Sequence, residues 1–265
     1  MKAEILSVLS PAYPWKAHLH WFDSIGSTND EAKRMALAGA PHGTVLVAGH
    51  QTGGHGRLGR SFHSPADVGV YLTLILRPDC TPDQLMHLTC ATAVAMCDAV
   101  ENATGLRPGI KWTNDLVCGH RKLGGILTAL GLTTKGRVDF AIIGIGINCC
   151  QSQADFPEEI RDMAGSLAMV TGRPIDRAAV AAAMMEALHR MDTTLLTGAD
   201  VMLEAYRRDC ITLGQDVVLV RGDEKRYGHA LSIDSAGALI VRFADGTLEA
   251  VNSGEVSVRG MYGYT

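Results

Sequence analysis

The sequence predicts an α+β protein in which a large mixed-sheet domain is followed by a small β-barrel. Helical and strand-forming segments alternate irregularly up to about residue 150, so neighbouring strands can pair locally instead of forming regular βαβ units. Helical sequence rich in alanine and methionine then fills residues 157–210, and only short strands and turns follow from Gly214. The 265 residues exceed the usual length of one domain, about 100–200 residues. We therefore expect two domains, residues 1–212 and 213–265.

Local signals place the elements of the large domain along the chain. After an extended opening, Ser27 is expected to cap a helix in which Thr28 and Glu31 have capping-box spacing, and Gly39 with Pro41 ends this helix. Runs of β-branched and apolar residues predict strands at residues 45–48, 68–76, 110–112, 116–118, 125–130 and 138–147. Apolar residues at helical spacing predict helices at residues 82–103, 157–171, 175–196 and 199–210.

The small domain is predicted from short strands separated by turns. Residues 234–237 and the pair Asp245-Gly246 are turn signals, and Asp-Gly is among the strongest short hairpin signals. The strands are expected at residues 216–220, 226–233, 238–243, 248–251 and 256–259. Five short strands without an intervening helix are typical of a small β-barrel.

Composition excludes several classes of protein. Hydrophobic residues make up 47% of the chain and charged residues 20%, as in ordinary globular domains. The net charge of −4 provides no basic field for nucleic acid or an anionic membrane, so neither partner is expected. Seven cysteines without a Cys-x-x-Cys pair predict free thiols in a reducing compartment. With no signal-peptide pattern and no apolar span of about 20 residues, a cytoplasmic protein is expected.

A glycine-rich loop over residues 51–60 is the first candidate site. Its glycines can turn main-chain N–H groups toward an anion, and Arg57 and Arg60 add charge suited to phosphate or carboxylate. The loop lacks the Gly-Lys-Ser/Thr ending of a P-loop and the setting of a dinucleotide fingerprint. Read in isolation, it is equally well a mobile surface loop whose glycines serve only turns.

Two further segments carry polar residues at strand ends. Asn114 and Asp115 lie in a polar break between two apolar strands, and Lys122 opens the next strand beside two glycines, where it can approach a ligand closely. Asn148 ends an apolar strand whose glycines could clear space for a planar ligand. The alternatives are a solvated lysine at a hairpin end, an Asn-Asp turn, and a buried strand ended by a polar residue.

Five short motifs occur in an order that resembles the biotin protein ligase family. They are Ser-Thr-Asn at 27–29, Gln-x-x-Gly-x-Gly-Arg-x-Gly-Arg at 51–60, Lys-Trp-x-Asn-Asp at 111–115, Arg-Lys-x-x-Gly-Ile-Leu at 121–127 and Gly-x-Gly-Ile-Asn at 144–148. Each motif is weak alone, and their order makes the set specific. The resemblance covers residues 22–150 closely and resumes at 237–259. It implies a catalytic domain of the biotin/lipoate ligase type with a small SH3-like barrel.

The resemblance also implies an activity and a set of site residues. Biotin and ATP would form biotinyl-5'-AMP and pyrophosphate, and the biotin would pass to a lysine of a biotin carboxyl carrier domain. The implied catalytic residues are Arg57, Asp115 and Lys122. The implied biotin-binding residues are Ser27, Thr28, Asn29, Gln51, His55, Gly56, Arg57 and Lys122. The implied ATP-binding residues are Gly54, Arg57, Arg60, Asn114, Asn148, Glu255 and Arg259, with Mg²⁺ held mainly by the ATP phosphates.

Two features qualify the resemblance. His55 stands where family members usually have the first arginine of the loop, which could loosen retention of the adenylate and make the site sensitive to pH. About twenty residues precede the first motif, too few for the helix-turn-helix domain of the repressor-type members, so a monofunctional ligase is expected. A homodimer is possible within the family. The alternatives are a lipoate or octanoate ligase or transferase, and a non-catalytic paralogue that binds biotin or nucleotide.

Overall fold

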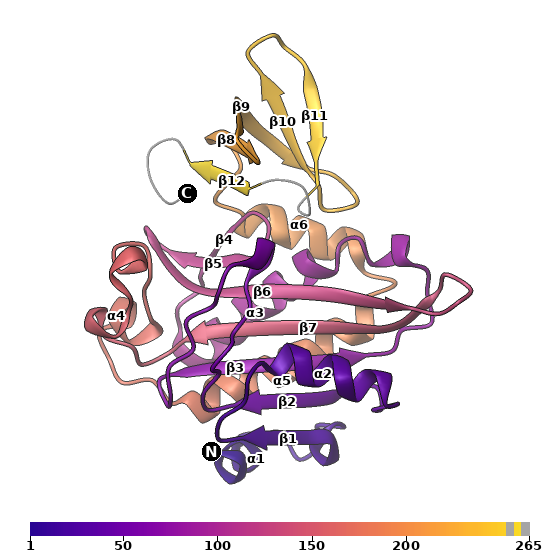
Figure 1. Ribbon diagram of the computed structural model, residues 1–265, viewed down its shortest axis with the longest axis vertical. Coiled ribbons are helices and arrows are strands. Elements are labelled where there is room, and N and C mark those ends of the chain that lie inside the picture. Colours follow the sequence, from indigo (N-terminus) through magenta and orange to yellow (C-terminus); the bar gives the residue numbers. More distant parts are fainter. Residues whose placement is uncertain (253–256, 261–265) are drawn as a thin grey trace.

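The strands form two separate β-sheets (Figure 1). The computed structural model describes residues 1–252 and 257–260. The larger sheet contains β1 (Leu19–Phe22), β2 (Thr44–Ala48), β3 (Gly69–Leu76), β4 (Gly109–Lys111), β5 (Asp115–Cys118), β6 (Arg121–Leu132) and β7 (Val138–Asn148). The smaller sheet contains β8 (Asp216–Arg221), β9 (Glu224–Ile233), β10 (Leu239–Phe243), β11 (Leu248–Val251) and β12 (Ser257–Gly260). The predicted α+β class is confirmed.

The larger sheet is mixed, as the sequence predicts. Its spatial order is β1-β2-β3-β7-β6-β5-β4. β1 and β2 pair in parallel, whereas every other neighbouring pair is antiparallel. β3 and β7 form the centre, with Gly69 opposite Asn148 and Leu76 opposite Ala141. Both strands read as continuous apolar runs because each is buried on its two faces.

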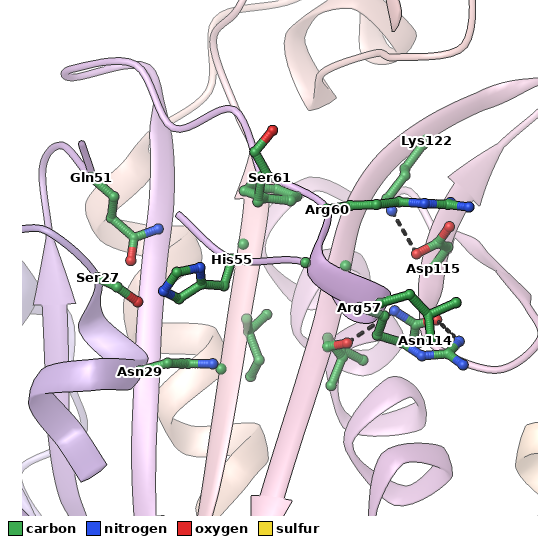
Figure 2. Close-up of a pocket in the computed structure, with 18 of the residues that line it drawn as sticks. Ser27, Asn29, Gln51, His55, Arg57, Arg60, Ser61, Asn114, Asp115 and Lys122 are labelled. Carbon is green, nitrogen blue, oxygen red and sulfur yellow. Dashed lines mark hydrogen bonds and ion pairs between the residues drawn. The ribbon is translucent and has the colours of Figure 1, made fainter. Parts of the chain in front are cut away.

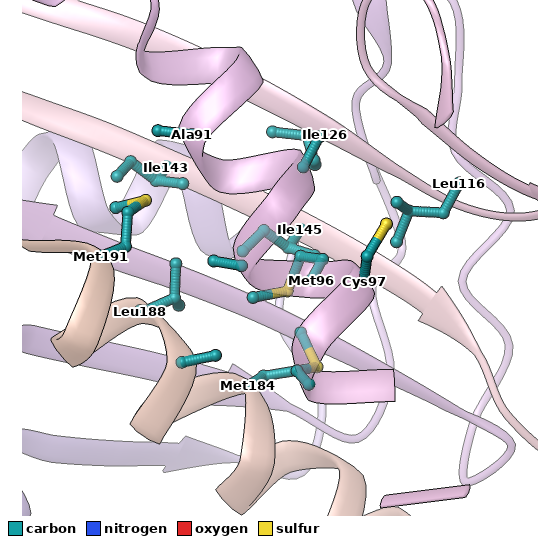
Figure 3. Close-up of a cluster of buried hydrophobic side chains, with 14 of the residues drawn as sticks. Ala91, Met96, Cys97, Leu116, Ile126, Ile143, Ile145, Met184, Leu188 and Met191 are labelled. Atoms are coloured by element: carbon teal, nitrogen blue, oxygen red, sulfur yellow. The ribbon is translucent and has the colours of Figure 1, made fainter. Parts of the chain in front are cut away.

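Helices cover the two faces of this sheet unequally. The α-helices are α1 (Lys2–Val8), α2 (Thr28–Leu37), α3 (Leu88–Thr104), α4 (Leu167–Thr171), α5 (Arg177–Thr194) and α6 (Ala199–Asp209). Short 3₁₀ turns occur at Lys16–His18, Arg57–Gly59, Pro82–Leu85, Gln153–Asp155 and Glu158–Ile160. α3 and α5 pack together on one face, where Met96 and Leu188 meet Ile143 and Ile145 of β7 (Figure 3). Burial of such a side chain contributes about 1.5–3 kcal/mol each.

On the opposite face α2 leaves part of β7 uncovered. Alternate residues of a strand share a face, so Phe140, Ile142, Gly144 and Gly146 all point toward α2. α2 packs on Phe140 and Ile142 through its alanines. Gly144 and Gly146 have no side chain, so the Asn29 and Phe62 side chains can approach the sheet closely there, and α2 does not cover it. A cavity therefore forms over this end of β7.

The smaller sheet is antiparallel in the order β11-β10-β9-β8-β12 and lies against α6 (Figure 1). Its apolar residues, among them Val217 and Leu239, join the same buried cluster as the core of the large sheet. The indole Nε1 of Trp112 donates to the carbonyl of Gly237, 3.1 Å away, which links the two sheets directly. Closure of this sheet into a barrel and the division at 212/213 stay predictions. Among the described residues, no helix is long and apolar enough to span a membrane.

Two expectations about helices are wrong. The N-terminal residues form helix α1 instead of an extended segment, because Ile5 and Leu9, one turn apart, are both buried in the core that α1 joins against α5. The helix expected at 157–171 is reduced to the 3₁₀ turn and α4. Between them the backbone pairs with β6: Lys122 N donates to Met163 O at 2.7 Å, and Gly165 N donates to Lys122 O at 2.9 Å. A backbone paired with a strand in this way cannot complete helical hydrogen bonds.

One other helix begins later than expected, and another begins as expected but lacks the predicted capping contact. Residues 82–85 form a separate 3₁₀ turn with its own capping box, and α3 starts only at Leu88. α2 begins at Thr28 with Ser27 as its N-cap, yet neither residue makes the expected capping contact. The hydroxyl of Thr28 is instead 2.9 Å from Gln51 Oε1, so a tertiary contact replaces the local cap.

Candidate active site

A cavity of about 600 Å³ lies over this end of β7 (Figure 2). The start of α2, the glycine loop and the strands β4 to β7 contribute its lining. From the predicted site, the lining includes Ser27, Thr28, Asn29, Gln51, His55, Gly56, Arg57, Arg60, Asn114, Asp115 and Lys122. Residues that are far apart in the sequence thus meet at one hollow, as the motifs predict.

One wall of the cavity is polar and uncharged. Gln51 Oε1 accepts hydrogen bonds from the main-chain N–H of Thr28 at 2.8 Å and from its hydroxyl at 2.9 Å. Gln51 Nε2 donates to Ser64 Oγ at 3.1 Å. The Asn29 amide occupies the space that Gly144 leaves, since a Cβ on that glycine would overlap it. These contacts hold the wall in one arrangement, with Ser27 buried beside it.

The glycine loop crosses the cavity and is fastened at both ends. Gly53 N donates to Gly26 O at 2.7 Å, and Gly56 N donates to Arg60 O at 2.7 Å. Gly54 lies so close to the chain that returns beneath it that a Cβ would come within 2.5 Å of Phe62 O. A glycine is therefore required there for close packing. His55 Nε2 lies 2.8 Å from Asp30 Oδ2, which connects the loop to α2.

The other wall of the cavity is charged. Lys122 Nζ lies 2.7 Å from Asp115 Oδ1, and Arg57 Nη1 donates to Asn114 Oδ1 at 2.8 Å (Figure 2). Asn114 Nδ2 in turn donates to Ile126 O at 3.0 Å, which fixes the amide that receives Arg57. Burial lowers the pKa of the Arg57 guanidinium, and the Asp115 carboxylate opposes that shift. Arginine stays charged at neutral pH despite such a shift.

The cavity concentrates positive charge in a chain whose net charge is −4. Four cationic side chains line it, Arg57, Arg60, Lys111 and Lys122. Asp115 is the single carboxylate of the lining within the described part of the chain. A partly enclosed site with this excess of positive charge attracts anions such as carboxylates and phosphates.

Two predicted ATP-binding residues, Gly54 and Asn148, lie outside the cavity lining, and for two others the structure describes no side chain. Gly54 is buried behind the loop and supports it. Asn148 is buried outside the cavity lining, where Nδ2 donates to Gly165 O at 2.9 Å and Oδ1 accepts from Gln151 Nε2 at 3.1 Å. Arg259 is on β12, with its main chain paired opposite Val218. Glu255 falls outside the described residues.

The structure adds lining residues that were not predicted. Lys111 and Trp112 belong to the same motif as Asp115, so the motif itself could have suggested them. Leu58, Ser61 and Phe62 lie in or just after the glycine loop. Met163 reaches the cavity only because its segment pairs with Lys122, and no local signal in the sequence points to it. The remaining additions are Gly125, Ile126, Gly144, Ile145 and Gly146.

Comparisons with known proteins match both parts of the chain. The family model described as the biotin/lipoate A/B protein ligase family matches residues 21–148. The model described as the biotin protein ligase C terminal domain matches residues 212–259. The two matches cover most of the large sheet and of the cavity lining, and nearly all of the small sheet.

Individual relatives and structures agree with the family models. The bifunctional ligase/repressor BirA of Bacillus subtilis is 36% identical over 233 residues, which are 86% of this chain and 70% of that protein. A biotin–[acetyl-CoA-carboxylase] ligase of Mycobacterium tuberculosis is 30% identical over 237 residues, 87% of this chain and 85% of that protein. The structure of a biotin protein ligase from Aquifex aeolicus in complex with biotin and ATP has a TM-score of 0.77 at 28% identity, covering 91% of this chain and 98% of that chain.

Proposed function

Since the chain belongs to the biotin protein ligase family, we propose that it activates biotin with ATP and transfers the biotinyl group to a lysine of a carrier protein. The observation that carries this proposal is the division of one cavity into two unlike walls (Figure 2). Ser27, Asn29 and Gln51 offer neutral hydrogen-bonding groups on one side. Lys122 and Arg57 offer positive charge on the other. Biotin has a polar, uncharged ring system at one end and a carboxylate at the other, which matches this division.

The first step brings two anions together. A carboxylate oxygen of biotin attacks the α-phosphorus of ATP, a new O–P bond forms, and pyrophosphate leaves with the electrons of the bond that breaks. Arg57 and Lys122 offset the repulsion between the carboxylate and the phosphate as negative charge builds up in the transition state. The ion pair with Asp115 and the bond to Asn114 orient these two cations before the substrates arrive.

The second step needs a neutral amine at the same place. The ammonium of the carrier lysine first loses a proton, the resulting amine attacks the acyl carbon of the adenylate, and AMP leaves as the bond between that carbon and the phosphate oxygen breaks. Asp115 is the carboxylate of the cavity lining, in the described part of the chain, that can orient this ammonium or accept its proton. Its ion pair with Lys122, the residue proposed to contact the adenylate, supports this role.

Magnesium and the nucleotide contacts complete the proposal. The proposed Mg²⁺ would be held mainly by the ATP phosphates, since this ion usually binds through phosphates and few protein ligands. Asp115 is the residue that would contact Mg²⁺. When bound, the ion neutralises charge on the phosphates. Arg60, Asn114 and the main chain around Gly54 would face the nucleotide, with Asn148, Glu255 and Arg259 as further proposed contacts.

The partner and setting follow from the same proposal. The acceptor would be a biotin carboxyl carrier domain of a biotin-dependent carboxylase, reached in the cytoplasm. All seven cysteines are free, which suits a reducing compartment. We propose no role for nucleic acid or membrane. A homodimer is the proposed assembly, and sedimentation at micromolar concentration would test it.

Two linked assays on the purified full chain test the function. Pyrophosphate release in the presence of Mg·ATP is measured with biotin, lipoate or octanoate as the acyl substrate, and then labelling of a biotin carrier domain is measured. Biotin-dependent activity in both assays is expected. Activity with lipoate or octanoate in place of biotin would move the chain to the lipoate branch. Adenylate without transfer would indicate a biotin sensor, and no turnover at all would indicate a non-catalytic binder.

A further inference from the structure

A buried threonine lies in the middle of an apolar strand beneath the neutral wall of the cavity. Thr73 is on β3, where every residue is buried, and its own side chain is 0% exposed. It is absent from the cavity lining. A buried hydroxyl costs free energy of folding unless it is hydrogen-bonded. The hydrogen-bond partners of Thr73 therefore indicate its structural role.

Thr73 joins two residues of the cavity wall. Its Oγ1 lies 2.8 Å from Thr28 Oγ1 and 2.6 Å from Asn29 Oδ1. Thr28 Oγ1 is in turn 2.9 Å from Gln51 Oε1. Asn29, Thr73, Thr28 and Gln51 thus form one continuous chain of side chains from α2 through β3 to the glycine loop. We call these four residues the relay.

The direction of each hydrogen bond in the relay follows from the donors available. The main-chain N–H of Thr28 can only donate, so the Gln51 atom that receives it is the oxygen. The hydroxyl of Thr28 must then donate to the same oxygen, because an amide oxygen has no proton to give. The remaining lone pairs of Thr28 Oγ1 accept the proton of Thr73. Both hydroxyl protons of the relay are now used.

The contact between Thr73 and Asn29 therefore needs a proton from Asn29. The two ends of an asparagine amide have the same shape, and the hydrogen-bond network decides which end is which. With Nδ2 turned toward Thr73, all three contacts of the relay have one proton each. The cavity-facing end of the Asn29 amide, which Figure 2 draws as nitrogen, is then the oxygen. With the oxygen toward Thr73, two protons would have to serve three contacts.

We propose that Thr73 is a specificity-determining positioning residue, which fixes the Asn29 amide so that its carbonyl oxygen faces the cavity and selects a ligand with an N–H donor. The inference rests on the proposed function, because the ureido ring of biotin carries two N–H groups. One of these two N–H groups would donate its hydrogen bond to Asn29 Oδ1. Gly144 supports this arrangement by leaving the space in which the amide lies.

Conservative variants separate this role from a general structural one. Thr73→Val removes the hydroxyl and keeps the shape, Thr73→Ser keeps the hydroxyl, and Thr92→Val is the matched control. Thr92 is also 0% exposed, but it bonds to Leu88 O within α3, away from the cavity. Thr73→Val should raise the Kd and KM for biotin about 10-fold, and leave kcat at saturating biotin and the KM for ATP unchanged. Thr73→Ser should restore biotin binding, and Thr92→Val should not alter it.

Analogues of biotin test the donor itself. Replacing either ureido N–H by an oxygen atom gives two cyclic carbamates of nearly the same shape. The wild type should bind one of them at least about 10-fold more weakly than biotin, because two oxygens then face each other. In Thr73→Val the Asn29 amide is free to turn, so this ratio should fall toward 1. Calorimetry of each full-length variant without ATP gives the Kd values.

Three results would overturn the inference. The first is an unchanged Kd for biotin in Thr73→Val. The second is the same carbamate ratio in Thr73→Val and the wild type. The third is a parallel loss of biotin affinity, ATP affinity and kcat that Thr73→Ser fails to rescue, which would indicate misfolding. Absence of biotin binding by the wild type is distinguishable from all three, since it would overturn the proposed function and this inference with it.

Discussion

The charged wall depends on individual side chains that local structure holds in place. Lys122 is fixed on both sides, by its ion pair with Asp115 and by the main-chain bonds to Met163 and Gly165. A cation that is oriented in advance stabilises developing negative charge without reorganisation during the reaction. The position of Lys122, more than its charge alone, therefore suits it to the adenylation step.

Removal of this charge should slow adenylation strongly. In Lys122→Met the rate of biotin-dependent pyrophosphate exchange should fall about 10²–10³-fold, the usual cost of losing one preorganised donor. Lys135→Met is the matched control, because Lys135 is exposed in the turn between β6 and β7. Equal rates in the two variants would contradict the role assigned to Lys122.

His55 is the residue at which the glycine loop departs from the family pattern. It pairs with Asp30 at 2.8 Å, and both side chains are at least half exposed. Since an arginine at this position carries a fixed charge, we expect the adenylate to dissociate more slowly from His55→Arg than from the wild type, by no more than about 5-fold for so exposed a pair. Equal dissociation rates of the adenylate in the wild type and the variant would contradict this expectation.

At the scale of elements, the segment between β4 and β5 is held by neighbours from other parts of the chain. The hydroxyl of Tyr206 on α6 donates to Thr113 O at 3.1 Å. Trp112 N donates to Thr212 Oγ1 at 2.9 Å, and the Trp112 indole reaches Gly237. Asp115 follows directly along the chain. The linker after α6 and the small sheet thus both help to position the charged wall.

Loss of the indole contact should therefore affect the chemistry. Trp112→Phe removes the N–H donor and part of the ring, and we expect lower stability by about 1 kcal/mol and a several-fold lower kcat for adenylation. Trp21→Phe is the matched control. Trp21 lies on edge strand β1, and its indole also donates a hydrogen bond, to Asp23 at 2.8 Å. If both variants lost kcat equally, the small sheet would have no special part in positioning.

The end of α6 provides a test of pH dependence. Burial on its own raises the pKa of the Asp209 carboxyl, but hydrogen bonds from Arg208 and Arg107 outweigh it and hold that pKa below its ordinary value. A depressed folded-state pKa stabilises the protein above the unfolded-state pKa of the carboxyl, and this stabilisation disappears as pH falls through the folded-state value. Asp209→Asn should thus lower the free energy of unfolding by about 1–3 kcal/mol at pH 7.

The difference between wild type and Asp209→Asn should shrink below about pH 4, where an unperturbed aspartate becomes protonated. Urea titrations at pH 7, 5 and 3.5 would measure it. A difference that stays constant over this range would show that the packing of Asp209, and not its charge, stabilises the end of α6.

At the scale of the whole molecule, one buried cluster runs through both sheets. Val217, Leu219 and Leu239 of the small sheet belong to the same cluster as the core between α3, α5 and the large sheet. When one of two sheets that share a core unfolds, the other sheet loses buried apolar contacts. The described chain should therefore behave as one cooperative unit.

Scanning calorimetry would test this cooperativity. We expect a single transition with equal calorimetric and van't Hoff enthalpies, which biotin shifts upward as a ligand of the native state. Biotin at about 100 times its Kd should add roughly 2.7 kcal/mol to the free energy of unfolding. Two separate transitions, only one of them moved by biotin, would show that the sheets unfold independently.

The sequence by itself determined the α+β class, most strand positions and the segments that meet at the cavity. These depend on local rules: apolar periodicity marks the strands, and glycines beside charged residues mark close approaches. The glycines of β7 indicated a close approach to the sheet, which in the structure is made by the Asn29 and Phe62 side chains. Residues 157–166 and the capping of α2 escaped these rules, because their hydrogen bonds go to distant partners.

Only the tertiary structure decided which atoms face the ligand cavity. Asn148 ends its strand as predicted, yet its amide bonds to Gly165 and Gln151, away from the lining. Met163 lines the cavity because its segment pairs with Lys122. Thr73 supports the cavity wall because it bonds to Thr28 and Asn29 at the start of α2. Side-chain direction and hydrogen-bond partners depend on contacts between segments far apart in the chain, and no local pattern records those contacts.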